Sequence, residues 1–137
     1  MQSFPTSTFL RRVLLADAAT CLAAGLLMTL GAPLLEQFFG LPSGLSRYAG
    51  VSLLPFAAFL VYLATRETLP AAAVWAVIVL NVLWTLDSLL LLLSGWVAPT
   101  PSGYAFVIAQ ALGVAMFAAL EYVGLKKATT ATTAAAA

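Results

Sequence analysis

The sequence has no histidine and a single cysteine, and only 8% of its 137 residues are charged. Without histidine the chain cannot build a Ser-His-Asp arrangement, a histidine-ligated haem or a His-built metal centre. The lone Cys21 can form neither an internal disulfide nor a thiolate metal site, and we expect it to be a small buried packing residue. The sequence therefore predicts no metal, no cofactor and no enzymatic activity.

Charge is scarce in both signs, whereas apolar residues are abundant. Six Lys and Arg against five Asp and Glu leave a net charge of +1, which is too little for a nucleic-acid binder. Hydrophobic residues make up 63% of the chain, against roughly 45–50% in soluble domains. This composition excludes a disordered chain and a soluble globule. It predicts an integral membrane protein whose first partner is the lipid bilayer.

Four apolar stretches have the length of about 20 residues that a bilayer-spanning helix needs. They lie at about 13–30, 45–63, 71–93 and 104–123. Lipid cannot satisfy exposed peptide groups, so these stretches must be helices rather than strands. We expect an all-α fold, a four-helix transmembrane bundle forming one membrane domain over residues 1–127. The tail at 128–137 contains only Ala and Thr, and we expect it to be mobile or loosely helical.

Two shorter features fall outside this pattern. Residues 34–39 are too short to span a membrane but combine apolar and polar side chains, so we interpret them as an interfacial helical turn after the first span. Arg11 and Arg12 followed by an apolar run look like a signal peptide. Because Asp17 interrupts that apolar run, we expect the segment to be retained as a helix.

The distribution of basic residues predicts the orientation. Five of the six lie on the side that would hold both termini, and only Arg47 lies on the other. The positive-inside rule then predicts cytoplasmic termini and a multi-pass protein of a bacterial inner membrane. Trp96 and Tyr104 become outer interface anchors, and Tyr122 an inner one.

Acidic residues near the ends of the spans are interpreted from their depth. Asp17 lies four residues after Val13, about 6 Å along a helix, and Glu121 lies close to the end of the last span. Both are therefore expected at the cytoplasmic interface, paired with basic side chains. The predicted cytoplasmic charge cluster consists of Arg11, Arg12, Asp17, Arg66, Glu121, Lys126 and Lys127.

The third span carries polar side chains along one face. Asn81, Trp84 and Ser88 recur at helical spacing, and Asp87 lies at the edge of the same face. With Gln110 and Arg47 at similar depth, about 9 Å below the outer surface, these residues predict an outward polar site with Arg47 and Asp87 close together. The site is either a ligand site or structural glue, in which an interhelical hydrogen bond contributes about 0.6 kcal/mol.

The stretch 81–127 contains the pieces N-x-L-W, S-G-W, A-F-x-x-x-Q and E-Y-x-G-L. In these pieces it resembles small bacterial integral membrane proteins of uncharacterised function. The resemblance implies a bacterial inner membrane and brings no activity or site with it.

Two functions remain open on the sequence. The first is a non-catalytic protein that acts by helix association, as a small subunit or assembly partner of a larger membrane complex or as a homo-oligomer. It is favoured by the short loops and the absence of catalytic side chains. The second is a small-molecule or proton-coupled transporter or sensor that uses the polar site around Asp87, favoured by an ionisable side chain within a span.

Overall fold

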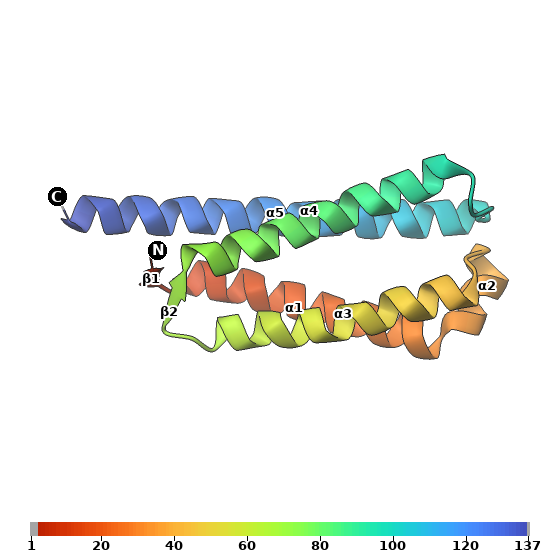
Figure 1. The fold of residues 1–137 in the computed structure, drawn as a ribbon, viewed down its shortest axis with the longest axis horizontal. Helices are drawn as coiled ribbons and strands as arrows, with labels where there is room; N and C mark the ends of the chain where they lie inside the picture. The colour runs from red at the N-terminus through yellow and green to blue at the C-terminus, as the bar shows by residue number, and fades with distance from the viewer. Residues whose placement is uncertain (1–2, 137) are drawn as a thin grey trace.

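A computed structural model describes residues 3–136, and it is helical over most of this length (Figure 1). Four helices are long and apolar enough to cross a membrane, as predicted. They are α1 (Thr8–Leu30), α3 (Ser43–Ala64), α4 (Ala71–Ser94) and α5 (Pro101–Ala136). The short helix α2 (Ala32–Phe39) lies at one end of the bundle, called here the α2 end. Strands β1 (Ser3–Pro5) and β2 (Thr68–Pro70) lie at the other, the terminal end.

All four helices extend beyond their predicted bounds, and α1 and α5 do so by the most. Helix α1 begins five residues before Val13, because the Ser7 hydroxyl accepts a hydrogen bond from the backbone N–H of Leu10 at 3.1 Å and caps the helix there. Helix α5 does not stop near residue 123 but continues through the Ala/Thr segment to Ala136. The change of composition at residue 128 is therefore not a helix boundary.

The four long helices form two antiparallel pairs, α1 with α3 and α4 with α5 (Figure 1). Helices α1 and α3 approach closely where Gly25 faces Gly50. A Cβ atom on Gly50 would lie 2.8 Å from the carbonyl oxygen of Gly25, which is closer than real side chains come. Small residues of this kind allow helix backbones to pack directly in lipid.

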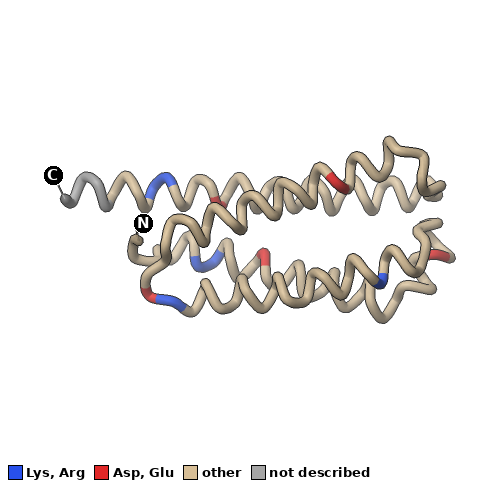
Figure 2. Tube along the Cα trace, viewed as in Figure 1, with Lys and Arg blue, Asp and Glu red and all other residues tan. Residues whose placement is uncertain are grey.

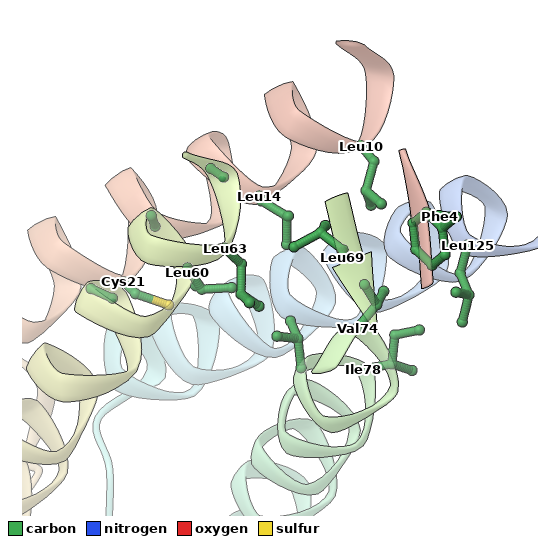
Figure 3. Close-up of a cluster of buried hydrophobic side chains, with 14 of the residues drawn as sticks. Phe4, Leu10, Leu14, Cys21, Leu60, Leu63, Leu69, Val74, Ile78 and Leu125 are labelled. Carbon is green, nitrogen blue, oxygen red and sulfur yellow. The ribbon is translucent and has the colours of Figure 1, made fainter. Parts of the chain in front are cut away.

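The terminal end has a dense hydrophobic core (Figure 3). The two strands pair antiparallel, with Phe4 opposite Leu69, and these two side chains are 1% and 0% exposed. Leu10, Leu14 and Leu60 close the same core from α1 and α3. The strands therefore tie the N-terminal segment to the connection between α3 and α4.

At the α2 end, backbone contacts hold α2 against the start of α5. Gly40 ends α2 in the left-handed conformation, at φ 69°. Thr100 then donates its N–H to the carbonyl of Phe39 at 3.0 Å and its hydroxyl to that of Phe38 at 2.8 Å. The ring of Phe39 stacks on Phe106 with centroids 4.9 Å apart. Leu35 of α2 is buried, whereas Leu34 and Phe38 are exposed.

Candidate functional site

A buried polar cluster joins three helices. Asp17 on α1, Asn81 on α4 and Glu121 on α5 are 1%, 2% and 0% exposed. The side-chain amide of Asn81 donates hydrogen bonds to both carboxyl groups, at 2.8 Å to Oδ2 of Asp17 and at 2.7 Å to Oε1 of Glu121. One amide thus holds two carboxyl groups against each other inside the bundle.

The expected pairing of Asp17 and Glu121 with basic side chains is not found, because both carboxyl groups are buried and hydrogen-bond to Asn81. Asp17 lies nine residues after the start of α1, and Asn81 lies ten residues after the start of α4. Both are therefore about 14 Å from the terminal end. Asp17 lies deeper in its helix than counting from Val13 indicates, because the capped α1 begins at Thr8. Glu121 likewise lies well inside α5, which continues past it to Ala136.

The basic members of the predicted cluster do gather at the terminal end (Figure 2). Their contacts, however, are with carbonyls and rings. Arg11 donates to the carbonyl oxygen of Arg66 at 3.3 Å, while Lys126 and Lys127 lie over the rings of Tyr122 and Phe9. Arg12 is exposed. Across residues 3–131, whose side chains are described, no cation forms an ion pair with either buried carboxyl group.

The cluster has more acceptors than donors. Besides the Asn81 amide, the only other donor to the carboxyl pair among the described side chains is the thiol of Cys21, whose Sγ lies 3.5 Å from Oδ1 of Asp17. Oε2 of Glu121 is buried without a hydrogen-bond donor in the described part of the chain. Both carboxyl groups accept from the same nitrogen, Nδ2 of Asn81, so they lie next to each other. A hydrogen bond from one carboxyl group to the other would need a proton on one of them, because a carboxylate has no donor of its own.

A central cavity of about 470 Å³ lies beside this cluster. All four long helices contribute to its wall, which is mostly apolar. Polar groups of the wall come from Asp17, Asn81, Trp84 and Gln110. Cys21 also lines the cavity, and it is buried, as predicted. The carboxyl group of Asp17 therefore borders an apolar space large enough for a small organic molecule.

Part of the predicted polar site does assemble, beside the central cavity. The indole N–H of Trp84 donates to Oε1 of Gln110 at 2.7 Å, and Nε2 of Gln110 donates to the Ser88 hydroxyl at 3.0 Å. A second cavity of about 270 Å³ lies toward the α2 end, and Trp84 and Gln110 line both cavities. Their hydrogen bond therefore lies between the two spaces.

The remaining members of the predicted site lie elsewhere. Asn81 belongs to the carboxyl cluster rather than to the Trp84–Gln110 chain. Asp87 and Arg47 are both exposed, and no hydrogen bond or ion pair joins them within the described residues. Asp87 lines the second cavity. It lies three residues after Trp84, so its side chain projects about 60° away from the inward face of α4.

The aromatic residues predicted as interface anchors are exposed. Trp96 is 86% exposed in the connection after α4, and Tyr104 is 41% exposed in the first turn of α5. Tyr122, also 41% exposed, packs edge-on against Trp75 with ring centroids 5.8 Å apart.

Gly113 also lines the cavity, although its sequence context did not predict this. It lies on the cavity wall, and a Cβ atom built on it would have no neighbour within 4 Å. A glycine in the middle of a helix destabilises the helix by about 1 kcal/mol relative to alanine. A glycine inside a predicted span is therefore the feature of the sequence that could have pointed to this position.

Comparison with known proteins adds no relative: no family model, curated protein or solved structure matches the chain. The resemblance to small bacterial membrane proteins stays a prediction. Function is therefore inferred from the geometry of the carboxyl pair and the cavity.

Proposed function

We propose that this protein binds a small amphipathic molecule in its central cavity and couples the transport of that molecule to proton transfer at the Asp17–Glu121 pair. This is the transporter alternative raised by the sequence, with the acidic site moved from Asp87 to Asp17. One observation carries it. Two buried carboxyl groups, without a cation among the described side chains, border a cavity that all four long helices line.

The energetic cost of burying Asp17 and Glu121 favours a role in function over a purely structural role. A buried carboxylate without a cation is costly, and in lipid the cost is not relieved by water. Apolar residues of similar volume often stabilise a fold as well as a buried charged network does. Here the Asn81 amide and the Cys21 thiol leave Oε2 of Glu121 without a donor. A proton is the simplest partner for such a pair, and its binding and release can be linked to a ligand.

The accessibility of the cavity can be tested with the native cysteine. Cys21 and Ala18 are both buried members of the hydrophobic core on α1, but only Cys21 also lines the cavity. Purified protein in detergent is treated with methyl methanethiosulfonate, a small neutral thiol reagent, and modification is followed by intact mass. We expect Cys21 to react at least about tenfold faster than the cysteine of an Ala18→Cys, Cys21→Ser variant, because reaction needs access. Equal rates would overturn the proposal.

We also propose that both termini face the cytoplasm of a bacterial inner membrane, with α2 at the outer interface. Five of the six basic residues lie at the terminal end (Figure 2), as the positive-inside rule requires. Trp96 and Tyr104 would then anchor the outer side, and Tyr122 the inner. In intact cells of a Cys21→Ser strain, an impermeant maleimide should label a cysteine at Ser102 and spare one at Thr129. The opposite pattern would reverse the orientation.

A second candidate function, association with another membrane chain, is favoured by Asp87. This carboxyl group is exposed on a candidate span and has no hydrogen-bond or ion-pair partner among residues 3–131. An unpartnered carboxylate on a lipid-facing surface is costly, and a second copy or a larger subunit could cover it. Native mass spectrometry from mild detergent distinguishes these possibilities. If Asp87→Leu changes neither the oligomeric state nor the set of co-purifying subunits, association does not depend on this residue.

A further inference from the structure

We infer that the ligand of the central cavity is a monovalent organic cation with apolar substituents, and that its binding releases one proton from the Asp17–Glu121 pair. The inference rests on the proposed function and names its substrate class. Three observations support it: the charge of the wall, the aromatic side chains on it, and the hydrogen bonds of the buried pair.

The charge of the cavity wall selects against anions. Among the described residues, no Lys or Arg lines the cavity and Asp17 is the only acidic residue on the wall, with Glu121 joined to it through the Asn81 amide. An anionic ligand would meet a carboxyl group with no compensating positive charge. A cation would supply the positive charge that this pair lacks.

The rest of the wall suits a cation that carries apolar groups. The aromatic residues Trp84 and Phe56 line the cavity, beside small and aliphatic side chains. An aromatic face attracts an ammonium group, most strongly when water is excluded. A strongly hydrated inorganic ion would gain nothing from such a surface, whereas an amine with hydrocarbon substituents would gain from both parts of it.

The proton follows from charge balance. When the cavity has no cation, a proton bridges the two carboxyl groups and lowers their combined charge. When the cation enters, an O–H bond of the pair breaks, the proton leaves to water, and the carboxylate formed becomes the counter-ion. The charge carried within the membrane is then unchanged by the exchange. No oxidant, reductant or further reactant is needed.

Few other titratable groups face this pair. Helix α1 adds the thiol of Cys21, and α4 adds only the neutral amide of Asn81. The cavity wall from α3 consists of Ser52, Leu53 and Phe56, none of which titrates. From α5, the wall residues are all uncharged, and Glu121 itself is the titratable group. A released proton is therefore assigned to the carboxyl pair or, as the one other source, to Cys21.

The test uses two molecules of nearly the same shape. Benzyltrimethylammonium has no proton to lose, and neopentylbenzene is its neutral carbon analogue. Each is added to the purified full chain in weakly buffered detergent with a pH indicator, while protection of Cys21 from methyl methanethiosulfonate reports occupancy. We expect only the cation to protect Cys21 at low concentration, with release of about one proton per bound cation. Cys21→Ser should release the same amount, because the proton comes from the carboxyl pair.

Two matched variants locate the source of the proton. Asp17→Asn keeps the size of the side chain and should weaken cation binding by at least about tenfold and abolish proton release. Glu121→Gln should do the same. Asp87→Asn, the same change outside the central cavity, should leave both quantities unchanged. Occupancy is read here by changes in the intrinsic Trp84 fluorescence of a Trp75→Phe, Trp96→Phe background, so that each variant is measured in the same way.

The outcomes separate the two proposals. If neopentylbenzene protects Cys21 as well as the cation does, or if the cation binds without releasing a proton, the ligand class is wrong while the accessible cavity stands. If the cation does not protect a rapidly reacting Cys21, the ligand class is again wrong. If Cys21 reacts no faster than a cysteine at Ala18, the proposed function itself fails.

Discussion

The terminal end and the middle of the bundle are built from the same four helices, yet they differ in how their side chains fill space. At the terminal end, Leu10, Leu14 and Leu60 are completely buried around the two strands (Figure 3). In the middle, the same helices line a partly open cavity of about 470 Å³. Fully buried apolar side chains thus gather at the terminal end, and the hydrophobic core reaches the cavity wall through Cys21 and Leu53.

The difference has a simple steric origin. The strands insert Phe4 and Leu69 between the helices at the terminal end, where they fill the space. No such segment enters the middle, and the wall there includes small residues, among them Ala24, Ala109 and Gly113. Small side chains on facing helices leave room unless the backbones move together, as they do at Gly25 and Gly50.

The largest expected effect comes from the same substitution at a packed and an open glycine. Gly50→Leu would drive a side chain into the carbonyl of Gly25, whereas Gly113→Leu would extend into the cavity. We expect Gly50→Leu to cost 3 kcal/mol or more, roughly the upper range for overpacking, and Gly113→Leu to cost less than about 1 kcal/mol. Reversible unfolding in mixed micelles measures both.

Substitutions at Gly113 also test access to the central cavity. Gly113→Leu should slow modification of Cys21 by methyl methanethiosulfonate, while Gly113→Ala should leave the rate near that of the unaltered protein. Equal stability losses for Gly50→Leu and Gly113→Leu would mean that the middle is as densely packed as the α1–α3 contact.

A smaller effect is expected from leucine truncation. Leu60 is fully buried at the terminal end, whereas Leu80 lines the cavity and is 47% exposed. Leu60→Ala should destabilise the protein by about 2–3 kcal/mol, because it opens a void in a filled core. Leu80→Ala should cost about 1 kcal/mol or less, since it only enlarges a space that is already open. The same unfolding measurement applies, and a reversed order would contradict the contrast between the two regions.

The sequence predicts the number of helices because hydropathy over about 20 residues is a strong signal. It predicts their ends less well. The cap at Ser7 is visible as a serine just before the helical pattern, but the charged Arg11 and Arg12 made Val13 look like the start. Basic residues can lie inside the first turns of a membrane helix because their long side chains reach the interface.

The site was harder to predict because depth decides which polar residues meet. Measured from the helix starts at Thr8 and Ala71, Asp17 and Asn81 lie at nearly the same depth, as their hydrogen bond at 2.8 Å requires. Measured from Val13, Asp17 lies near the end of the span, which led to its predicted pairing with basic side chains. Which faces turn inward, and whether space remains between them, depends on helix rotation and packing, which a single sequence does not specify.

Removing the Asn81 amide tests how much the buried carboxyl cluster contributes to stability. Asn81→Leu leaves two buried carboxyl groups without their amide partner, and we expect a loss of about 1–3 kcal/mol. Adding Asp17→Asn should recover part of this loss, because the new amide can donate to Glu121. Thermal unfolding of the single and double variants measures both effects. A double variant that is less stable than Asn81→Leu alone would show that the cluster is held by something other than this donor.

The smallest effect on stability is expected where the two cavities meet. Gln110 accepts from the indole of Trp84 and donates to Ser88, so Gln110→Leu removes two interhelical hydrogen bonds at nearly constant volume. At about 0.6 kcal/mol each, the loss should be near 1 kcal/mol. The effect on access should be larger, since the freed indole of Trp84 no longer separates the central cavity from the one toward the α2 end. We therefore expect methyl methanethiosulfonate to modify Cys21 several-fold faster in Gln110→Leu, and no faster in the control Gln37→Leu on α2. An unchanged rate in Gln110→Leu would mean that this hydrogen bond is not a barrier between the two spaces, because the reagent would then already reach Cys21 by another route.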